Sequence, residues 1–519
     1  MIPLGLCALI SACMIGPDFH RPPAPVATQW REANSPFVDT TRQDYRDWWT
    51  VFNDPVLTRL IYLARAQNLD ELTAGIRVLE ERAQLGIAIG ELYPQQQQGN
   101  ASLTYNRIPS SGAYALTKNT YASDIFGAQA AWEIDLWGKL RRAVQSADAA
   151  FLASVAAYDD VLVTLTADVA SDYVQIRTIQ TQLVIAHQNV DRQRQALDIA
   201  RARFLGGAAT GRDPDSAENV LGATEATVPP LELQLEQVKD ALSVLIGRPP
   251  GSVDEILAGS SDIPTAPDHV AVGIPADLLR RRPDVREAEL TAAAQCAQIG
   301  FAKADLLPTL SLTGEVGTVA SNIGSNNLSK VFTPNSLLFS AGPSLVWNIL
   351  NYGQITNNVR VQDARFQELI VAYQSSVLNA QAEVDTGLTS FLQSRLEVQF
   401  LAKSAAAAAD ALSIAILQYR EGTVDFTTVL TAEQNLLVAQ NNLALAQGAV
   451  PLGLIATYRA MGGGWQLREG YDFVPPATAI EMANRTNWGT LLTPSLLHPQ
   501  VPDVPSPANE KSLVRTPEW

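Results

Sequence analysis

The sequence is poor in the residues on which most enzymes depend, with only 4 histidines and 3 cysteines among 519 residues. No two histidines are spaced as metal ligands usually are. The run Gly462–Gly464 is followed by Trp and Gln, where a phosphate-binding loop needs Lys and then Ser or Thr. No nucleophile-elbow motif occurs. The sequence therefore predicts no catalytic residue, no metal site and no enzymatic activity.

Basic residues are also scarce relative to acidic ones. The chain has 37 Lys and Arg against 53 Asp and Glu, which gives a net charge of −16. Nucleic acids and anionic lipid headgroups are bound by basic surfaces. The charge balance therefore argues against a nucleic-acid partner.

Long apolar runs are missing after the first 16 residues. None reaches about 18 consecutive apolar residues, so the sequence predicts no transmembrane helix. The opening MIPLGLCALISACMIG is apolar but too short to span a bilayer, and it is typical of a secretory signal. Ile10–Cys13 resembles a bacterial lipobox, so we expect cleavage before Cys13 and a covalent lipid on its thiol. A plain signal peptide with an incidental cysteine is the alternative. No Lys or Arg precedes the apolar run, so either the true start lies upstream or the amino terminus alone supplies the positive charge.

Cleavage there would remove Cys7 and leave Cys296 as the one unmodified thiol. A single thiol forms no intrachain disulfide. Cys296 lies in the small-residue stretch TAAAQCAQ, which predicts a buried structural thiol on a tightly packed helix face.

What the sequence does contain is a long repeat. WEIDLWG at Trp132–Gly138 is followed by WNILNYG at Trp347–Gly353, an offset of 215 residues (347 − 132). The same offset aligns Ala217–Glu218 with Ala432–Glu433. A constant offset over about a hundred residues predicts an internal duplication, that is, two large halves of one structure. We call residues separated by this offset repeat-equivalent.

Each half begins with residues that alternate between apolar and polar, the pattern of paired β-strands. The segments are ASLTYN (Ala101–Asn106), AQAAWEID (Ala128–Asp135), TLSLTGEV (Thr309–Val316) and PSLVWNI (Pro343–Ile349). Strands of about ten residues with one apolar and one polar face are typical of membrane barrels, although a soluble half-buried sheet has the same alternation. Trp132 and Trp347 lie near the strand ends, where an interfacial aromatic belt would lie.

The hydrophobic period then changes to seven, which predicts long coiled-coil helices. Neither Gly138–Leu205 nor Gly353–Arg420 contains proline. A helix of that length is about 100 Å long, several times the ~30 Å of a bilayer core. Helices returning over Ser216–Ile246 and Phe426–Ala460 would complete one helical hairpin in each half. Gly138 and Gly353 would mark the strand-to-helix junctions.

Four strands cannot close a barrel, because about eight is the usual minimum. An open sheet edge is not tolerated in lipid. Several copies of the chain are therefore expected to share one barrel.

Four segments, in order along the chain, resemble one known family. They are CMIGPDFHRPPAP (Cys13–Pro25), IPADLLRRRPDVREAE (Ile274–Glu289), IGFAKADLLPTLSLTG (Ile299–Gly314) and MGGGW (Met461–Trp465). With the duplication, they resemble the TolC-like outer-membrane efflux proteins, specifically the NodT-type lipoproteins of resistance-nodulation-division pumps. The resemblance implies a mixed α and β membrane protein that is trimeric and internally duplicated. Four strands per protomer would form a shared 12-stranded transmembrane β-barrel, which continues into a long α-helical coiled-coil barrel across the periplasm.

The resemblance also implies location and partners. The protein would be lipid-anchored through Cys13 in the outer membrane of a Gram-negative bacterium, with most of the chain in the periplasm and no other cofactor. It would act as a homotrimer with a periplasmic membrane-fusion adaptor and an inner-membrane resistance-nodulation-division pump. The implied function is a passive gated conduit that exports drugs or other small molecules. The alternatives are an exit duct for type I protein secretion and, in a different class, a coiled-coil envelope scaffold without transport.

In such proteins the tunnel narrows at the periplasmic tip. The family pattern there resembles Y-R-x-G-x-x-x-[YF]-L-x-x-L-D-A, and this sequence has YREGTVDFTTVLTA, with Thr427 and Thr431 where Leu and Asp are common. Charged side chains from several copies would form a ring at a narrow mouth, which can bias ions and gate the tunnel. Capping of a helix start by Asp213 is the simpler alternative. The candidate gate residues are Arg212, Asp213, Asp215, Asp425, Thr427 and Thr431.

The chain is accordingly expected to divide as follows: 1–12, lipoprotein signal peptide; 13–53, lipidated extended segment; 54–94, helical start of the first repeat; 95–137, first β-hairpin; 138–247, first long helical hairpin; 248–282, equatorial connection; 283–308, helical start of the second repeat; 309–352, second β-hairpin; 353–461, second long helical hairpin; 462–519, equatorial C-terminal segment.

Overall fold

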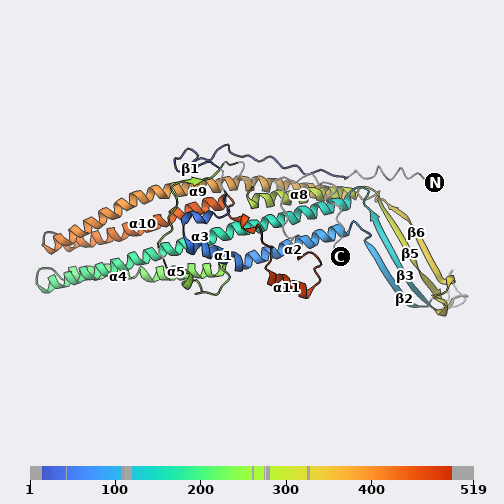
Figure 1. Cartoon of the computed structure of the whole chain (residues 1–519), viewed down its shortest axis with the longest axis horizontal. Helices are drawn as coiled ribbons and strands as arrows, with labels where there is room; N and C mark the ends of the chain where they lie inside the picture. Colours follow the sequence, from blue (N-terminus) through green and yellow to red (C-terminus); the bar gives the residue numbers. More distant parts are fainter. Residues whose placement is uncertain are drawn as a thin grey trace.

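The computed structural model describes residues 14–41, 44–107, 109, 120–259, 262–273, 275, 281–323 and 328–493. Long helices lie side by side in an elongated trunk, and a four-stranded sheet extends from one end of it (Figure 1). The opposite end of the trunk consists of two turns between helices. Cys13, the expected site of lipid attachment, lies outside the described residues.

The sheet is antiparallel and has the strand order β2-β3-β5-β6. The strands are β2 (Gln96–Arg107), β3 (Thr120–Ile134), β5 (Thr309–Ser321) and β6 (Leu337–Val346). Trp132 lies opposite Leu312, and Gln129 lies opposite both Gln98 and Glu315. Because side chains alternate between faces along a strand, this register places most apolar residues of both hairpins on one face and most polar ones on the other. The exceptions include Ile125, Val319 and Leu338 on the polar face and Asp124 and Thr318 on the apolar face. Within the described residues β2 and β6 have one neighbour each, so the sheet has two open edges.

Two helices of 67 residues dominate the trunk, α3 (Lys139–Leu205) and α9 (Gln354–Arg420). Each begins directly after a glycine in the left-handed region, Gly138 with φ 75° and Gly353 with φ 80°. A side chain would strain this backbone. At Gly138 a Cβ would also lie 2.6 Å from the Cγ atom of Met14.

The returning helices differ between the halves. The helix expected over Ser216–Ile246 is instead two helices, α4 (Arg212–Glu225) and α5 (Val228–Leu245). Pro229 and Pro230 explain the break, because proline lacks an N–H and fits only the first turn of a helix. The second returning helix, α10 (Phe426–Ala460), is continuous and has the expected bounds.

Shorter helices cover α3. Two of them, α1 (Pro55–Gln67) and α2 (Leu69–Gly90), pack on α3, while α8 (Pro283–Ala304) packs on both α3 and α9. Asp54 fixes the start of α1, since its side chain accepts hydrogen bonds from the N–H groups of Val56 and Leu57. The remaining elements are β1 (Val38–Asp39), which pairs with β4 (Val270–Ala271), and η2 (Trp48–Phe52), α6 (Asp254–Leu257), η3 (Leu328–Lys330), η4 (Pro334–Ser336), η5 (Trp465–Arg468) and α11 (Pro476–Arg485).

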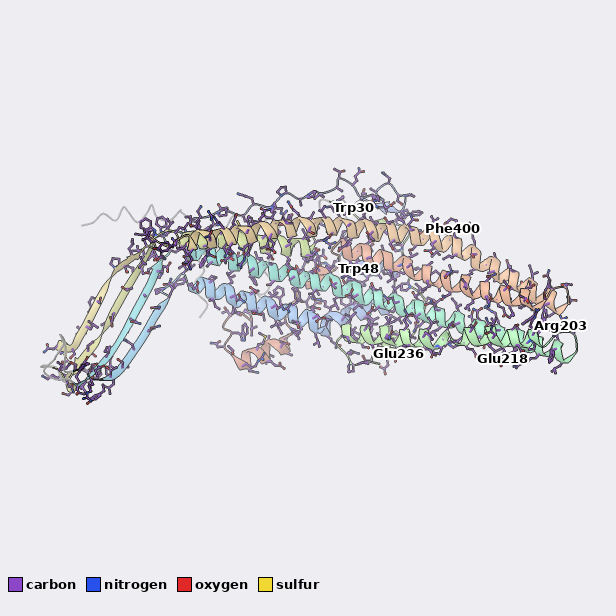
Figure 2. The ribbon with its side chains drawn as sticks, turned by 180° about the vertical axis from the view of Figure 1, so that it is seen from behind. Trp30, Trp48, Arg203, Glu218, Glu236 and Phe400 are labelled. Carbon is purple, nitrogen blue, oxygen red and sulfur yellow. The ribbon has the colours of Figure 1, made fainter. Side chains whose placement is uncertain are left out.

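The largest hydrophobic core joins α1, α3, α9 and α10 to the irregular segments of the chain. Trp48, labelled in Figure 2, is buried there and stacks on Tyr458 with ring centroids 5.3 Å apart. Trp30 is buried in the same core and donates its Nε1–H to the carbonyl of Gly273 at 3.2 Å. Aromatic burial of this kind dominates core energetics. The connecting segments are therefore packed parts of the trunk.

The segment that follows Cys13 is also fixed to the trunk. The buried guanidinium of Arg142 donates to the carbonyl of Gly16 at 3.3 Å and to Asp18 Oδ1 at 2.9 Å. The Sγ atom of Cys296 lies 3.7 Å from the carbonyl of Pro17. Cys296 is a free thiol and is buried, as predicted.

By length and composition, α3 and α9 each contain an 18-residue window apolar enough to cross a membrane. Core helices of soluble proteins have the same length and composition, so the prediction of no transmembrane helix stays a prediction. In α3, 56% of the window is buried inside the molecule, as in a core helix. In α9 only 17% is buried, so an apolar stretch of this helix is uncovered in the single chain.

Candidate functional site

The end of the trunk furthest from the sheet is formed by one turn from each half. The chain passes from α3 to α4 through residues 206–211, where Gly207 has φ 69°. It passes from α9 to α10 through residues 421–425, where Gly422 has φ 75°. Glycine permits this left-handed backbone and therefore a tight reversal. Arg203, labelled in Figure 2, lies at this end of the trunk.

Three side chains connect the two turns, and we call them the tip latch: Arg203 of α3, Tyr419 of α9 and Asp213 of α4. The Cζ atom of Arg203 lies 4.5 Å from the ring centroid of Tyr419, and Nη1 donates to the Tyr419 carbonyl. The Tyr419 hydroxyl donates to Asp213 Oδ2 at 3.3 Å. Burial, followed by the charge of Asp213, raises the pKa of Tyr419, which keeps the hydroxyl protonated as a donor. The latch therefore joins the first helical hairpin to the second.

The expected gate residues of the first half lie in the first turn of α4. Arg212 and Asp215 are exposed there, whereas Asp213 is partly buried and accepts the hydrogen bond from Tyr419. Asp213 does not cap the helix, because Gly211 occupies the N-cap position and α4 begins at Arg212. Carboxylates in a first turn still interact favourably with the positive end of the helix dipole.

The expected gate residues of the second half, Asp425, Thr427 and Thr431, line one groove, which we call the α9–α10 groove. Its volume is about 1160 Å³, and most of its wall consists of alanines and other small side chains. Asp425 occupies the N-cap position of α10 without a side-chain capping bond. The Thr431 hydroxyl donates to the Thr427 carbonyl at 2.8 Å. These three residues therefore lie together on the second hairpin. Of the two expected gate acids of α4, Asp213 accepts a hydrogen bond from Tyr419 and Asp215 is exposed.

Sequence reasoning did not single out Arg203 or assign a role to Tyr419. The available signal was the comparison of repeat-equivalent positions, because Tyr419 is equivalent to Phe204 and adds one hydroxyl to it. A polar group at a heptad position close to a turn has to find a partner when it is buried. Which partner it finds depends on how the two hairpins pack, and this packing is not encoded locally.

At the other end of the trunk, two tryptophans mark the base of the sheet. Trp132 donates its Nε1–H to the carbonyl of Leu92 at 3.1 Å, and Trp347 donates to the carbonyl of Leu306 at 3.1 Å. Both rings remain partly exposed. An apolar ring with a satisfied N–H suits the boundary between hydrocarbon and water. The two hairpins thus present equivalent tryptophans at equivalent places.

One buried carboxylate lies between the long helices near the tip. Glu433 of α10 is 2% exposed, and neither of its carboxylate oxygens has a hydrogen-bond partner among the described residues. Burial raises its pKa to about 7, and the positive charge of Arg192 on α3 opposes the shift. Gln193 of α3 is equally buried, and its side-chain amide is likewise unpaired within the described chain.

An open sheet with one apolar face, joined to a long helical trunk, is the architecture expected from the sequence for a protomer of an outer-membrane channel. The family model for the outer membrane efflux protein matches residues 60–248 and 274–463. The chain therefore belongs to the outer membrane efflux protein family, a family of non-enzymatic transport proteins of the Gram-negative outer membrane. This confirms the predicted family and location and the prediction that the protein is not an enzyme.

Curated relatives span nearly the whole chain. Nodulation protein T of Rhizobium leguminosarum bv. trifolii is 30% identical over 442 residues, 84% of this chain and 91% of the relative. The pyoverdine export outer membrane protein OpmQ of Pseudomonas putida is 30% identical over 423 residues, 81% of this chain and 88% of the relative. The cation efflux system protein CusC of Escherichia coli K12 is 27% identical over 471 residues, 89% of this chain and 99% of the relative.

Solved structures agree with the fold. The outer-membrane channel OprN superimposes with a TM-score of 0.81 at 30% identity, covering 88% of this chain and 100% of its own. The open state of the MtrE outer membrane channel of Neisseria gonorrhoeae superimposes with a TM-score of 0.74 at 27% identity, covering 87% of this chain and 99% of its own. The fold is therefore that of the TolC-like outer membrane channels.

Proposed function

We propose that this protein is the outer-membrane exit duct of a tripartite efflux pump, a passive gated conduit for small molecules. The observation that carries the proposal is the sheet of four strands, apolar on one face and open at both edges, on a trunk of 67-residue helices. A helix of 67 residues is about 100 Å long, enough to bridge much of a periplasm. The sheet supplies the membrane part and the trunk supplies the tunnel.

The duct requires several copies of the chain. Four strands are too few to close a barrel, and lipid does not tolerate the open edges of β2 and β6. We infer a homotrimer with a shared 12-stranded barrel, the assembly implied by the resemblance to TolC-like efflux proteins. The uncovered side of α9 supports this assembly, since Leu378 is 50% exposed and Phe400, labelled in Figure 2, is 61% exposed. Apolar surface of this extent on a long helix is best buried against another copy.

A lipid on Cys13 would add an anchor beside the barrel. Met14, the next residue, packs against Gly138 at the base of the sheet, and the Ile15 N–H donates to the Trp137 carbonyl at 3.0 Å. An acyl group on the preceding residue would thus meet the membrane at the level of the tryptophan belt. The barrel and the acyl chains together would fix the height of the trunk.

The gate of the duct is assigned to the tip. In this proposal the tip latch holds the two hairpins together at rest, and opening moves them apart. Arg212, Asp215, Asp425, Thr427 and Thr431 would then set the charge and width of the mouth. A periplasmic adaptor would engage the two turns and pull on the latch, while an inner-membrane resistance-nodulation-division pump supplies the energy.

The cargo is expected to be chosen by that pump. Relatives of similar identity are named for nodulation, for pyoverdine export and for cation efflux. One duct architecture therefore serves chemically different cargo, and this chain is expected to pass whatever small molecules its partner pump delivers.

Accumulation of ethidium in the host tests the proposal. Deletion of the gene should raise accumulation, and restoring the parent chain should reverse the rise. Restoring the Leu378→Asp variant, which should not assemble, is the matched control and should leave accumulation high. Unchanged accumulation together with loss of a secreted protein from the medium would instead assign the duct to type I secretion. Unchanged accumulation with normal secretion would exclude ethidium as a cargo, and a purified chain that forms no conducting channel in a planar bilayer would reject the duct.

A further inference from the structure

The two faces of the sheet carry very different side chains. The first, which we call the apolar face, exposes Leu103, Tyr105 and Phe339. Register places them on the same side as Trp132 and Leu312. The opposite face, which we call the polar face, carries residues such as Ser102, Thr104, Thr313 and Ser344. In a shared barrel, the apolar face turns to lipid and the polar face lines the lumen.

One level of the polar face stands out. Gln98, Gln129, Glu315 and Ser340 lie directly opposite one another across all four strands, and we call them the filter row. Gln129 Nε2 donates to Gln98 Oε1 at 3.0 Å, which fixes these two side chains relative to each other. Glu315 lies between Gln129 and Ser340 and is half-buried. A complete polar row, with one carboxylate in it, therefore crosses the sheet.

On the central strands β3 and β5, the levels on either side of the filter row carry small side chains. The outer strands add Asn100 and Leu338 to the level toward the free end, and Gln96 to the level toward the trunk. Toward the free end of the sheet, Gly127 lies opposite Gly317. The strands approach so closely there that a Cβ on Gly317 would lie 2.5 Å from the Phe126 carbonyl oxygen. Toward the trunk, the next level holds Ala131 opposite Thr313, followed by Gly342. On β3 and β5, Gln129 and Glu315 thus lie between two pairs of small residues.

We propose that the filter row is a charge-selecting ring of the barrel lumen, in which Glu315 favours small cations and cationic solutes over anions. The inference rests on the proposed shared barrel, because only closure brings one Glu315 from each copy around a common axis. A carboxylate in a confined lumen with low-dielectric walls attracts cations and repels anions. Amide and hydroxyl neighbours leave that charge uncompensated, since no basic residue belongs to the row. The ring biases passage without selecting a particular cargo.

The polar face holds a second acid, which provides a matched comparison. Glu133 lies opposite Ser311, two levels nearer the trunk than Glu315. β2 begins only at Gln96, opposite Ala131, so the level of Glu133 has no β2 residue. Glu133 thus has the same charge and the same face but lies outside the complete row. Its removal should change selectivity less.

The experiment is the reversal potential of the purified full chain in a planar bilayer under a KCl gradient. The parent and all variants carry Asp213→Asn, Asp215→Asn and Asp425→Asn, so that the three acids of the candidate gate do not set the selectivity. Glu315→Gln should lower the ratio of potassium to chloride permeability by about twofold or more, and Glu315→Lys should invert the preference. Gln129→Glu, within the same row, should raise the ratio. Glu133→Gln should have a smaller effect, and Glu481→Gln on α11, away from the sheet, should have none.

The outcomes separate the ring from the duct. Normal conductance with an unchanged permeability ratio in both Glu315→Gln and Gln129→Glu would overturn the ring and leave the duct standing. An equal effect of Glu133→Gln would also overturn it, because the selectivity would then be a diffuse property of the lumen. Absence of any conductance from the parent with the three tip substitutions, in which the latch has lost the Asp213 carboxylate, would overturn the duct and the ring together.

Discussion

The two longest helices, α3 and α9, have the same length and the same start but opposite surroundings. Each has 67 residues and follows a glycine in the left-handed region. Yet α3 packs against α1, α2, α4, α5, α8 and α10, whereas α9 packs chiefly against α8 and α10. The most apolar window of α3 is 56% buried and that of α9 only 17%. One sequence pattern thus serves as the core of a chain in one half and as an uncovered surface in the other.

The different burial of α3 and α9 shows that repeat-equivalent positions can pack inside one chain or remain available for contact with another copy. A heptad seam specifies that a helix has partners along its length, but it does not specify whether they belong to the same chain. In α3 the partners are supplied by the shorter helices of the same copy. In α9 the partners on one side are missing, which is why assembly of several copies is part of the proposal. Substitutions at repeat-equivalent pairs can separate these two uses.

The largest effect is expected for Val163→Asp in α3. Val163 is 3% exposed, so the substitution places an unpaired carboxylate inside the protomer. Such a change costs about 3 to 5 kcal/mol, a large share of the free energy of unfolding. The variant should not accumulate as a folded protein in outer-membrane fractions. Parent-like yield and thermal unfolding would show that Val163 is not in the core.

Leu378→Asp, at the repeat-equivalent position of α9, should act differently. Leu378 is 50% exposed in the single chain, so the protomer should still fold, with a parent-like circular dichroism spectrum. A charge in the apolar contact between copies should prevent assembly, and analytical ultracentrifugation in detergent should detect protomers only. The matched control is Ile480→Asp on α11, an exposed apolar residue of a peripheral helix, which should leave the oligomer intact. A Leu378→Asp oligomer of parent size would contradict the role assigned to α9.

The comparison of the two halves also shows which features of the fold can be predicted from the sequence. The strands, the long helices and the glycines at their junctions follow from local periodicity and from the backbone freedom of glycine, so they could be predicted. Pro229 and Pro230 could have predicted the break between α4 and α5. The apolar period continues across this break, so periodicity alone predicts one continuous helix. The tip latch could not be predicted, because Arg203 and Tyr419 meet only when the two hairpins pack against each other. The different burial of α3 and α9 is equally a property of the whole fold.

A smaller effect is expected at another equivalent pair, Glu218 and Glu433. Glu218 is exposed and pairs with Arg201 at 3.2 Å, whereas Glu433 is buried without a hydrogen-bond partner in the described chain. Burial raises the pKa of Glu433 to about 7 from an ordinary value of 4.5, with Arg192 as the opposing charge. Between these values the folded state holds a proton that the unfolded state has lost, so the free energy of unfolding falls as the pH rises.

Glu433→Gln removes that ionisation. The variant should therefore unfold at a higher temperature than the parent at pH 8, by a stabilisation of at most about 3 kcal/mol, and at the same temperature near pH 4. Glu218→Gln is the control and should show no such pH dependence. If the advantage of Glu433→Gln were the same at both pH values, ionisation of Glu433 would not be its cause.

The smallest effect is expected at the tip, for Tyr419→Phe. The substitution keeps the ring beneath Arg203 and removes only the hydroxyl that donates to Asp213 at 3.3 Å. One such hydrogen bond is worth about 1 kcal/mol, which corresponds to about a fivefold change in the equilibrium between joined and separated hairpins. Single-channel recordings should therefore show a higher open probability with an unchanged conductance level. Phe204→Tyr, at the exposed repeat-equivalent position of α3, adds a hydroxyl where no latch exists and should leave the open probability unchanged. Equal open probabilities for Tyr419→Phe and the parent would mean that α3 and α9 are held together at the tip by packing alone, and that the latch does not gate the duct.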